Sequence, residues 1–164
     1  MRRIMMALGL LLLALVPAEA QQVTGIEIVE HGIYTTDITG QQSSSSGIVN
    51  QTVANAKLAL TTTTVAMQKG VEFGFRYRIS GTPADATVQI RKVVVFPAPG
   101  LTPPGKPTVR QNELPLTRHI GGTFYAGYSL DDPFELVPGK WTFQLWWNNR
   151  KMAEQSFTVV AQKR

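Results

Sequence analysis

The sequence has no cysteine and only two histidines, His31 and His119, among its 164 residues. Without cysteine there can be neither a disulfide framework nor a lipid-bearing cysteine at a mature N-terminus. The histidines are far apart, and neither has a second histidine at the i, i+4 spacing of a zinc-binding helix. A site that combines both histidines with Asp37 or Asp131 stays open as an alternative. We expect no metal and no cofactor.

The sequence motifs that mark common catalytic sites are also missing. A nucleophilic serine requires a base beside it and commonly sits in a Gly-x-Ser-x-Gly turn between a strand and a helix. The segment 127–131 resembles that motif only superficially, because it falls inside an expected strand. No phosphate-binding glycine loop is present either. We therefore expect a protein that is not an enzyme.

The charge of the chain is weakly positive. Sixteen basic and eleven acidic residues give a formal net charge of +5. The lysines and arginines are scattered along the chain, whereas a nucleic-acid-binding domain gathers them on one face or one helix. We expect no nucleic-acid partner.

Long apolar runs are absent except at the N-terminus. Two arginines at positions 2 and 3 precede the apolar run Ile4–Val16, and the small-residue pattern Ala18-Glu19-Ala20 follows it. That order is typical of a secretory signal peptide, and thirteen apolar residues are fewer than the ~20 that a membrane-spanning helix needs. We expect a signal peptide over residues 1–20 and export to the periplasm or the medium. The mature protein, residues 21–164, would have no membrane span and a net charge of +4, because Arg2, Arg3 and Glu19 are removed. By length it would form one domain.

Alternation of apolar and polar residues dominates the mature chain. From Val71 to Ile79 every second residue is apolar, with Glu72, Arg76 and Arg78 among those on the other face. A similar pattern around Thr123 to Asp131 turns Tyr125 outward. Strict alternation predicts half-buried strands. Further strands are expected over 23–35, 55–67 and 87–96.

Two segments interrupt the strands. Residues 39–47 are rich in serine and flanked by glycine, which predicts an exposed flexible loop. Residues 97–107 contain five prolines and predict a long surface loop. Seven or eight short strands without a convincing helix indicate an all-β protein, an antiparallel immunoglobulin-like β-sandwich, with a small barrel as the structural rival.

The end of the chain reads as a hairpin. A two-residue loop of Asn148 and Asn149 would pair Phe143 with Glu154 and set a carboxylate among apolar side chains, at a cost in desolvation. We therefore predict a three-residue loop, 148–150, with the pairs Leu145–Ala153, Phe143–Gln155 and Trp141–Phe157 toward the core. Gln144–Glu154 and Trp146–Met152 would face outward.

Four side chains form a candidate binding patch: Trp146, Tyr125, Arg76 and Arg78. Exposed aromatics beside hydrogen-bond donors suit a protein partner or a sugar ring, provided that the strands are neighbours in one sheet. Alternatively, Trp146 packs against Met152 as a satellite cluster.

The C-terminal third carries a further signal in two segments, Glu135-Leu136-Val137-Pro138-Gly139-Lys140-Trp141-Thr142-Phe143 and Arg150-Lys151-Met152-Ala153-Glu154-Gln155-Ser156-Phe157-Thr158-Val159. With Gly32-Ile33-Tyr34 and Phe73-Gly74-Phe75, these segments resemble a family of small exported bacterial proteins that carry a domain of unknown function. The resemblance implies an exported β-sandwich and brings no established activity. We expect a non-enzymatic protein that binds another protein or a cell-envelope component, with a carbohydrate-binding module as the alternative.

Overall fold

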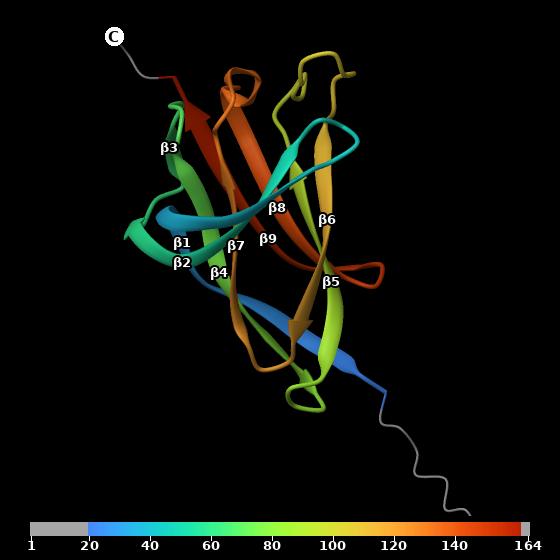
Figure 1. Cartoon of the computed structure of the whole chain (residues 1–164). Helices are drawn as coiled ribbons and strands as arrows, with labels where there is room; N and C mark the ends of the chain where they lie inside the picture. The colour runs from blue at the N-terminus through green and yellow to red at the C-terminus, as the bar shows by residue number, and fades with distance from the viewer. Residues whose placement is uncertain (1–19, 162–164) are drawn as a thin grey trace, which may run out of the picture.

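The structure is a computed structural model that describes residues 20–161. The expected signal peptide, residues 1–20, lies outside the described residues except for Ala20. Within them, nine strands form two sheets, and Figure 1 shows their arrangement. The strands are β1 (Gln22–Ser43), β2 (Val49–Leu60), β3 (Thr64–Ala66), β4 (Glu72–Thr82), β5 (Thr87–Val95), β6 (Gln111–His119), β7 (Thr123–Ser129), β8 (Gly139–Trp147) and β9 (Arg150–Val160). A 3-10 turn, η1 (Pro133–Glu135), precedes β8.

The two sheets pack face to face. One sheet has the strand order β2-β1-β4-β7, and the other has the order β3-β9-β8-β5-β6. All ladders are antiparallel except that between β3 and β9, which is parallel. The all-β sandwich prediction is confirmed, with nine strands in the described residues instead of seven or eight.

Aromatic side chains fill the space between the sheets. Phe73 and Tyr77 on β4 are fully buried, as are Trp141 and Phe143 on β8. The rings of Phe73 and Trp141 meet edge to face, 5.8 Å apart at 86°, the geometry that aromatic quadrupoles favour. The alternation along β4 thus selects the core face as the sequence predicts.

The terminal hairpin pairs as predicted over most of its length. Leu145 faces Ala153, Phe143 faces Gln155, and Gln144 faces Glu154. The difference lies at the turn, where Trp146 pairs with Lys151 and the register shifts between Leu145 and Trp146. The loop has two residues, and a bulge at β9 absorbs the extra residue that the three-residue prediction placed in the loop. Asn148 takes the positive φ, +52°, which asparagine tolerates better than arginine.

Two further sequence predictions are wrong. The serine-rich segment is not a flexible loop: β1 continues through Ser43, and a tight turn over 44–47 leads into β2. The Ser44 backbone N–H donates to the Ile48 carbonyl at 2.8 Å, and Ile48 is fully buried. The segment 111–119, to which no strand was assigned, forms β6 at a sheet edge, where Pro115 removes no ladder hydrogen bond.

The far halves of β1 and β2 leave the plane of their own sheet. We call residues 35–56 the arm. Figure 1 shows it crossing the front of the molecule from the β4 side toward β6. Register shifts in the β1–β2 ladder fall between Ile33 and Tyr34, between Thr35 and Asp37, and between Ile38 and Gly40. Because each bulge bends a strand and increases its twist, three in succession fold the arm back over the sheet.

Candidate functional site

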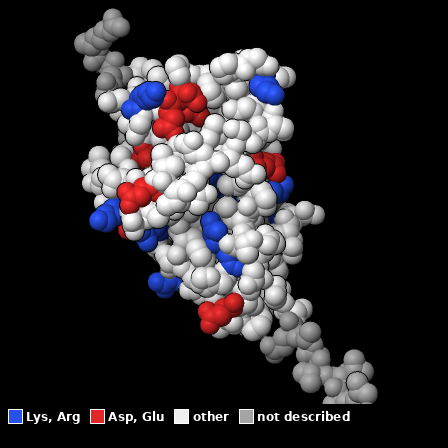
Figure 2. All heavy atoms as spheres, viewed as in Figure 1, with Lys and Arg blue, Asp and Glu red and all other residues white. Residues whose placement is uncertain are grey.

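A cleft of about 520 Å³ lies beneath the arm. The arm roofs it through residues 49–56, the whole of β7 forms one wall, and the inward side chains of β6 form the other. We call it the β6–β7 cleft. Figure 2 views the molecule from the same side and shows Lys and Arg atoms in the middle of this face, beside a hollow in the surface. Because β6 and β7 are the edge strands of different sheets, the cleft opens at a side of the sandwich.

The tip of the arm is fastened to both walls. Asn112 on β6 is buried, and its amide donates to Asn50 Oδ1 at 2.7 Å. Gln51 donates to Asp131, just beyond β7, at 2.5 Å. Ile48 joins the hydrophobic core. These contacts hold the roof in place at the end farthest from its own sheet.

The base of the arm rests on the outer face of β4. The Arg76 guanidinium donates to the Ala56 carbonyl and forms an ion pair with Glu30 at 3.1 Å. Thr36 donates its hydroxyl to Glu72 at 3.2 Å. Glu72 faces away from the core, yet it is only 9% exposed, because the arm covers it.

Two glycines shape the outer face of β7. The Tyr125 hydroxyl donates to Glu72 Oε1 at 2.9 Å, so the ring lies along the sheet instead of pointing to solvent. A Cβ at Gly127 would stand 1.9 Å from the Tyr125 hydroxyl oxygen, and one at Gly74 would stand 2.9 Å from the same atom. The glycines therefore leave the space that the ring occupies. Tyr34 packs on it at 4.7 Å between ring centroids.

Besides Arg76, which is paired with Glu30, two cations line the cleft. Lys92 on β5 shares the inward side of its strand with Val88, Ile90 and Val94, which are all buried. Its ammonium donates to the Gly127 carbonyl at 3.1 Å. Arg118 on β6 donates to the Tyr77 hydroxyl at 3.1 Å, and its guanidinium lies 5.0 Å from the centroid of the Phe124 ring. Neither side chain forms an ion pair with a carboxylate in residues 20–161.

The cleft shifts the protonation equilibria of its charged groups. Burial lowers the pKa of Lys92 to about 8, the nearby Glu72 opposes this shift, and Arg118 adds to it. Burial raises the pKa of Glu72, which the hydrogen bonds from Tyr125 and Thr36 partly offset. Both shifts have the direction that partial removal from water produces.

The far edge of β7 is unpaired within its sheet. The Leu130 N–H donates to the Val71 carbonyl, so the backbone groups of Leu130 point toward β4. In an antiparallel ladder, every second residue of β7 therefore points its backbone groups toward β4, and the residues between them point theirs away from it. Tyr125, Gly127 and Ser129 therefore present backbone donors and acceptors toward the cleft. Lys92 occupies one of these acceptors, the Gly127 carbonyl.

The structure divides the four residues of the predicted patch. Arg76 and Tyr125 are direct partners in the β4–β7 ladder, and both line the cleft. Arg78 lies on the same outer face and is exposed, but it does not line the cleft. Trp146 lies on the outer face of the other sheet. The predicted patch required strands that are neighbours in one sheet. Arg76, Arg78 and Tyr125 meet this condition, and Trp146 does not.

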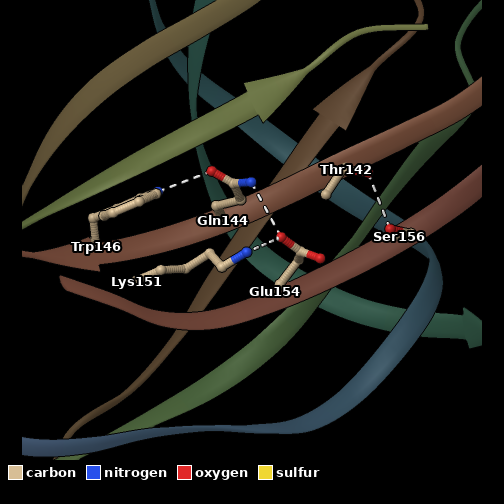
Figure 3. A network of polar contacts seen from close by, with 6 residues as sticks. All are labelled: Thr142, Gln144, Trp146, Lys151, Glu154 and Ser156. Atoms are coloured by element: carbon tan, nitrogen blue, oxygen red, sulfur yellow. Dashed lines mark hydrogen bonds and ion pairs between the residues drawn. The ribbon is translucent and has the colours of Figure 1, made fainter.

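Trp146 belongs to a separate polar network, shown in Figure 3. Its indole N–H donates to Gln144 at 3.0 Å, and the Arg91 guanidinium lies 5.5 Å from the centroid of its ring. Gln144 and Lys151 both donate to Glu154, and hydrogen bonding by Lys151 is the main reason that the pKa of Glu154 is lowered. The indole is half-buried in this network.

Sequence reasoning missed Lys92, Arg118 and the arm. The usable signal for Arg118 was the alternation of Leu114 and Leu116 around Pro115, which is typical of an edge strand. For Lys92 the signal was its place among the inward residues of 87–96. The arm had no such signal, since most of its residues are polar and its course depends on bulges.

No three His, Asp or Glu side chains in residues 20–161 are grouped so that they could hold a metal ion. In the same range, no helix has the length and apolar character required to cross a membrane.

Residues 22–159 match a family described as a domain of unknown function, DUF3859. The chain belongs to this family. No curated protein matches the chain. Among solved structures, an immunoglobulin-like protein from Pseudomonas aeruginosa is similar, with a TM-score of 0.59 and 24% sequence identity over 84% of this chain and 98% of that one. This likeness shows that the DUF3859 sandwich is immunoglobulin-like.

A second similarity is distant. The alkylpurine DNA glycosylase AlkC from Pseudomonas fluorescens gives a TM-score of 0.38 at 10% identity, over 79% of this chain and 30% of that one.

Proposed function

We propose that this DUF3859 protein is an exported, non-enzymatic binding protein, and that the β6–β7 cleft is its ligand site. Its ligand would be another protein or a component of the cell envelope. The observation that carries the proposal is the pair of inward-facing cations, Lys92 and Arg118, in a roofed cleft where neither has a carboxylate partner in residues 20–161.

The chemistry of the cleft lining supports binding over catalysis. No histidine lines the cleft in the part of the chain that the structure describes. The Ser129 hydroxyl donates to Asp131 at 2.8 Å, and the same carboxylate accepts from Gln51. A nucleophile needs a base that can take its proton, whereas Asp131 is already engaged in fastening the roof.

Export is supported by the order of basic, apolar and small residues at the N-terminus. Mass spectrometry of the protein recovered from the envelope fraction or the medium is expected to give a first residue of Gln21. An N-terminus at Met1 in a cytoplasmic fraction would contradict this part of the proposal.

Photo-crosslinking in intact cells tests the cleft itself. Thr52 is an exposed residue of the cleft lining, and Thr158 is an exposed residue on the outer face of β9. A crosslinking amino acid at position 52 is expected to give a discrete adduct that the same substitution at position 158 does not give. The adduct should weaken when Arg118→Gln is added. Identical adducts from both positions, or none from position 52, would show that the cleft is not the ligand site.

A further inference from the structure

We propose that the β6–β7 cleft binds an extended, acidic segment of a partner protein, which pairs with the free edge of β7 and places a carboxylate beside Lys92 and Arg118. This inference rests on the proposed function, because it names the ligand class of the same site.

The shape of the cleft suits an extended chain. Its lining includes every residue of β7, Thr123–Ser129. Seven residues of strand extend over about 20 Å, so the cleft is a channel that follows the strand. The residues that line the cleft from β6 are every second one, Leu114, Leu116 and Arg118. A ligand strand that lies alongside β6 would contact these three side chains with the side chains of one of its faces, because those also recur at every second residue.

The edge of β7 supplies backbone recognition. Strand addition to a free sheet edge gives a ligand main-chain hydrogen bonds, and adjacent side-chain sites give selectivity. The backbone groups of Tyr125, Gly127 and Ser129 face the cleft, and Lys92 donates to the Gly127 carbonyl. An entering carboxylate would draw the Lys92 ammonium toward itself, and the Gly127 carbonyl could then accept a backbone N–H of the ligand.

The charges select an acidic segment. Glu72 already accepts hydrogen bonds from Tyr125 and Thr36, and Asp131 accepts from Gln51 and Ser129. The acids of the cleft are thus engaged, while Lys92 and Arg118 form hydrogen bonds with neutral groups only. A carboxylate from the ligand would give both cations the partner that they lack, and a basic segment would meet two like charges.

Peptide binding by fluorescence anisotropy tests the inference on the purified protein. The probe is a labelled seven-residue peptide that alternates valine with polar residues, two of which are glutamate. Three comparison peptides carry glutamine in place of glutamate, lysine in place of glutamate, or N-methyl groups on the amides of one edge. We expect the acidic peptide to bind at least about tenfold more tightly than each comparison peptide, because each lacks either the charge or the donors.

Variants locate the binding. Lys92→Met and Arg118→Gln are each expected to weaken the acidic peptide by about tenfold or more, and Lys92→Arg should retain most of the affinity. Lys140→Met and Arg150→Gln are matched controls, since both residues are exposed and lie outside the cleft lining, and they should leave affinity unchanged. Circular dichroism and urea unfolding establish that each variant is folded.

Several results would overturn the inference. One is equal binding of the N-methylated peptide, because strand pairing would then be unnecessary. Another is full affinity in folded Lys92→Met together with Arg118→Gln. A third is that Lys92→Met self-associates but still binds the acidic peptide more tightly than the comparison peptides. The role of Lys92 would then be to prevent the edge of β7 from pairing with another molecule. If no peptide binds while position 52 still gives its Arg118-dependent adduct, the ligand class is wrong and the proposed function stands. If both experiments fail, the proposed function falls as well.

Discussion

Lys92 stands where strand alternation would place an apolar residue. Its neighbours at the same side of β5, Ile90 and Val94, are buried in the core. The lysine is tolerated because β5 lies next to the edge strand β6, so that its long side chain reaches the cleft and donates to Gly127. The partial burial nevertheless disfavours the charged form, and the pKa falls to about 8.

The titration of Lys92 makes a prediction about stability. In the unfolded chain the pKa returns to 10.5, so the unfolded state binds more protons between pH 8 and 10.5 and the wild type gains stability as pH rises through that range. Lys92→Met removes this dependence. The difference in unfolding free energy, variant minus wild type, should therefore decrease as the pH rises from 7 to 10.5. The decrease should be about 1–3 kcal/mol after allowance for solvent screening.

Urea unfolding at a series of pH values measures this difference. The other charged groups of the cleft, Glu72, Arg76, Arg118 and Asp131, are present in both proteins, so their own titrations largely cancel. Lys140→Met serves as a control on an exposed lysine. A difference between Lys92→Met and wild type that does not change with pH would show that the amine is not held away from water.

The arm is the element on which the cleft depends. A two-stranded ribbon on its own is marginally stable, and this one leaves its sheet after Tyr34. It is held over β4 and β7 by contacts with Arg76 and Glu72 at its base and by Asn50, Gln51 and Ile48 near its tip. Removal of one tip contact should loosen the roof while the sandwich persists.

Asn112→Ala is expected to do this. It removes the 2.7 Å hydrogen bond to Asn50 and leaves Asn50 to find another partner, at a cost of about 1–3 kcal/mol. Hydrogen exchange followed by mass spectrometry should show faster exchange in residues 49–56, with β4 and β8 unchanged. Asn149→Ala, in the exposed turn of the other hairpin, is the control. Uniform acceleration across both sheets would mean that the arm does not open as a separate unit.

The strands that could be predicted from sequence are those in which packing against neighbouring elements requires apolar and polar residues to alternate strictly. Buried Phe73 and Tyr77 mark β4, and the cost of burying Glu154 placed Gln144 opposite it. β6 and the arm could not be predicted in the same way. Pro115 interrupts the sequence pattern of β6. The arm is held mostly by polar contacts with residues distant in sequence, such as Asn112. Bulges carry no fixed sequence pattern, so the position of the roof follows from long-range contacts.

At the scale of the whole molecule, the sandwich has two outer faces with different roles. One is partly covered by the arm, and together with the edge of β6 it forms the cleft. The other carries the polar network around Trp146 (Figure 3). Trp146 is the residue on which a carbohydrate-binding alternative would depend. Its ring and N–H are engaged by Arg91 and Gln144, so a sugar would have to displace existing partners.

Trp146→Ala therefore should leave binding of the acidic peptide unchanged, because Trp146 lies outside the cleft lining. Stability should fall by about 0.5–2 kcal/mol through loss of the cation–π contact and of half-buried apolar area. A glycan array with the wild type is expected to show no signal that depends on Trp146. Sugar binding that is lost in Trp146→Ala would instead support the carbohydrate alternative.

The arm that roofs the cleft and the walls of the cleft come from separate stretches of chain, residues 35–56 and 111–131, and the arm ends in a short turn at 44–47, in which Ser45 is exposed. During evolution, mutation or lengthening of the roof can therefore proceed while the walls and the sandwich beneath them stay the same. Divergence of binding preference within DUF3859 should then concentrate in the first third of the domain, as it does where a constant scaffold carries a variable loop.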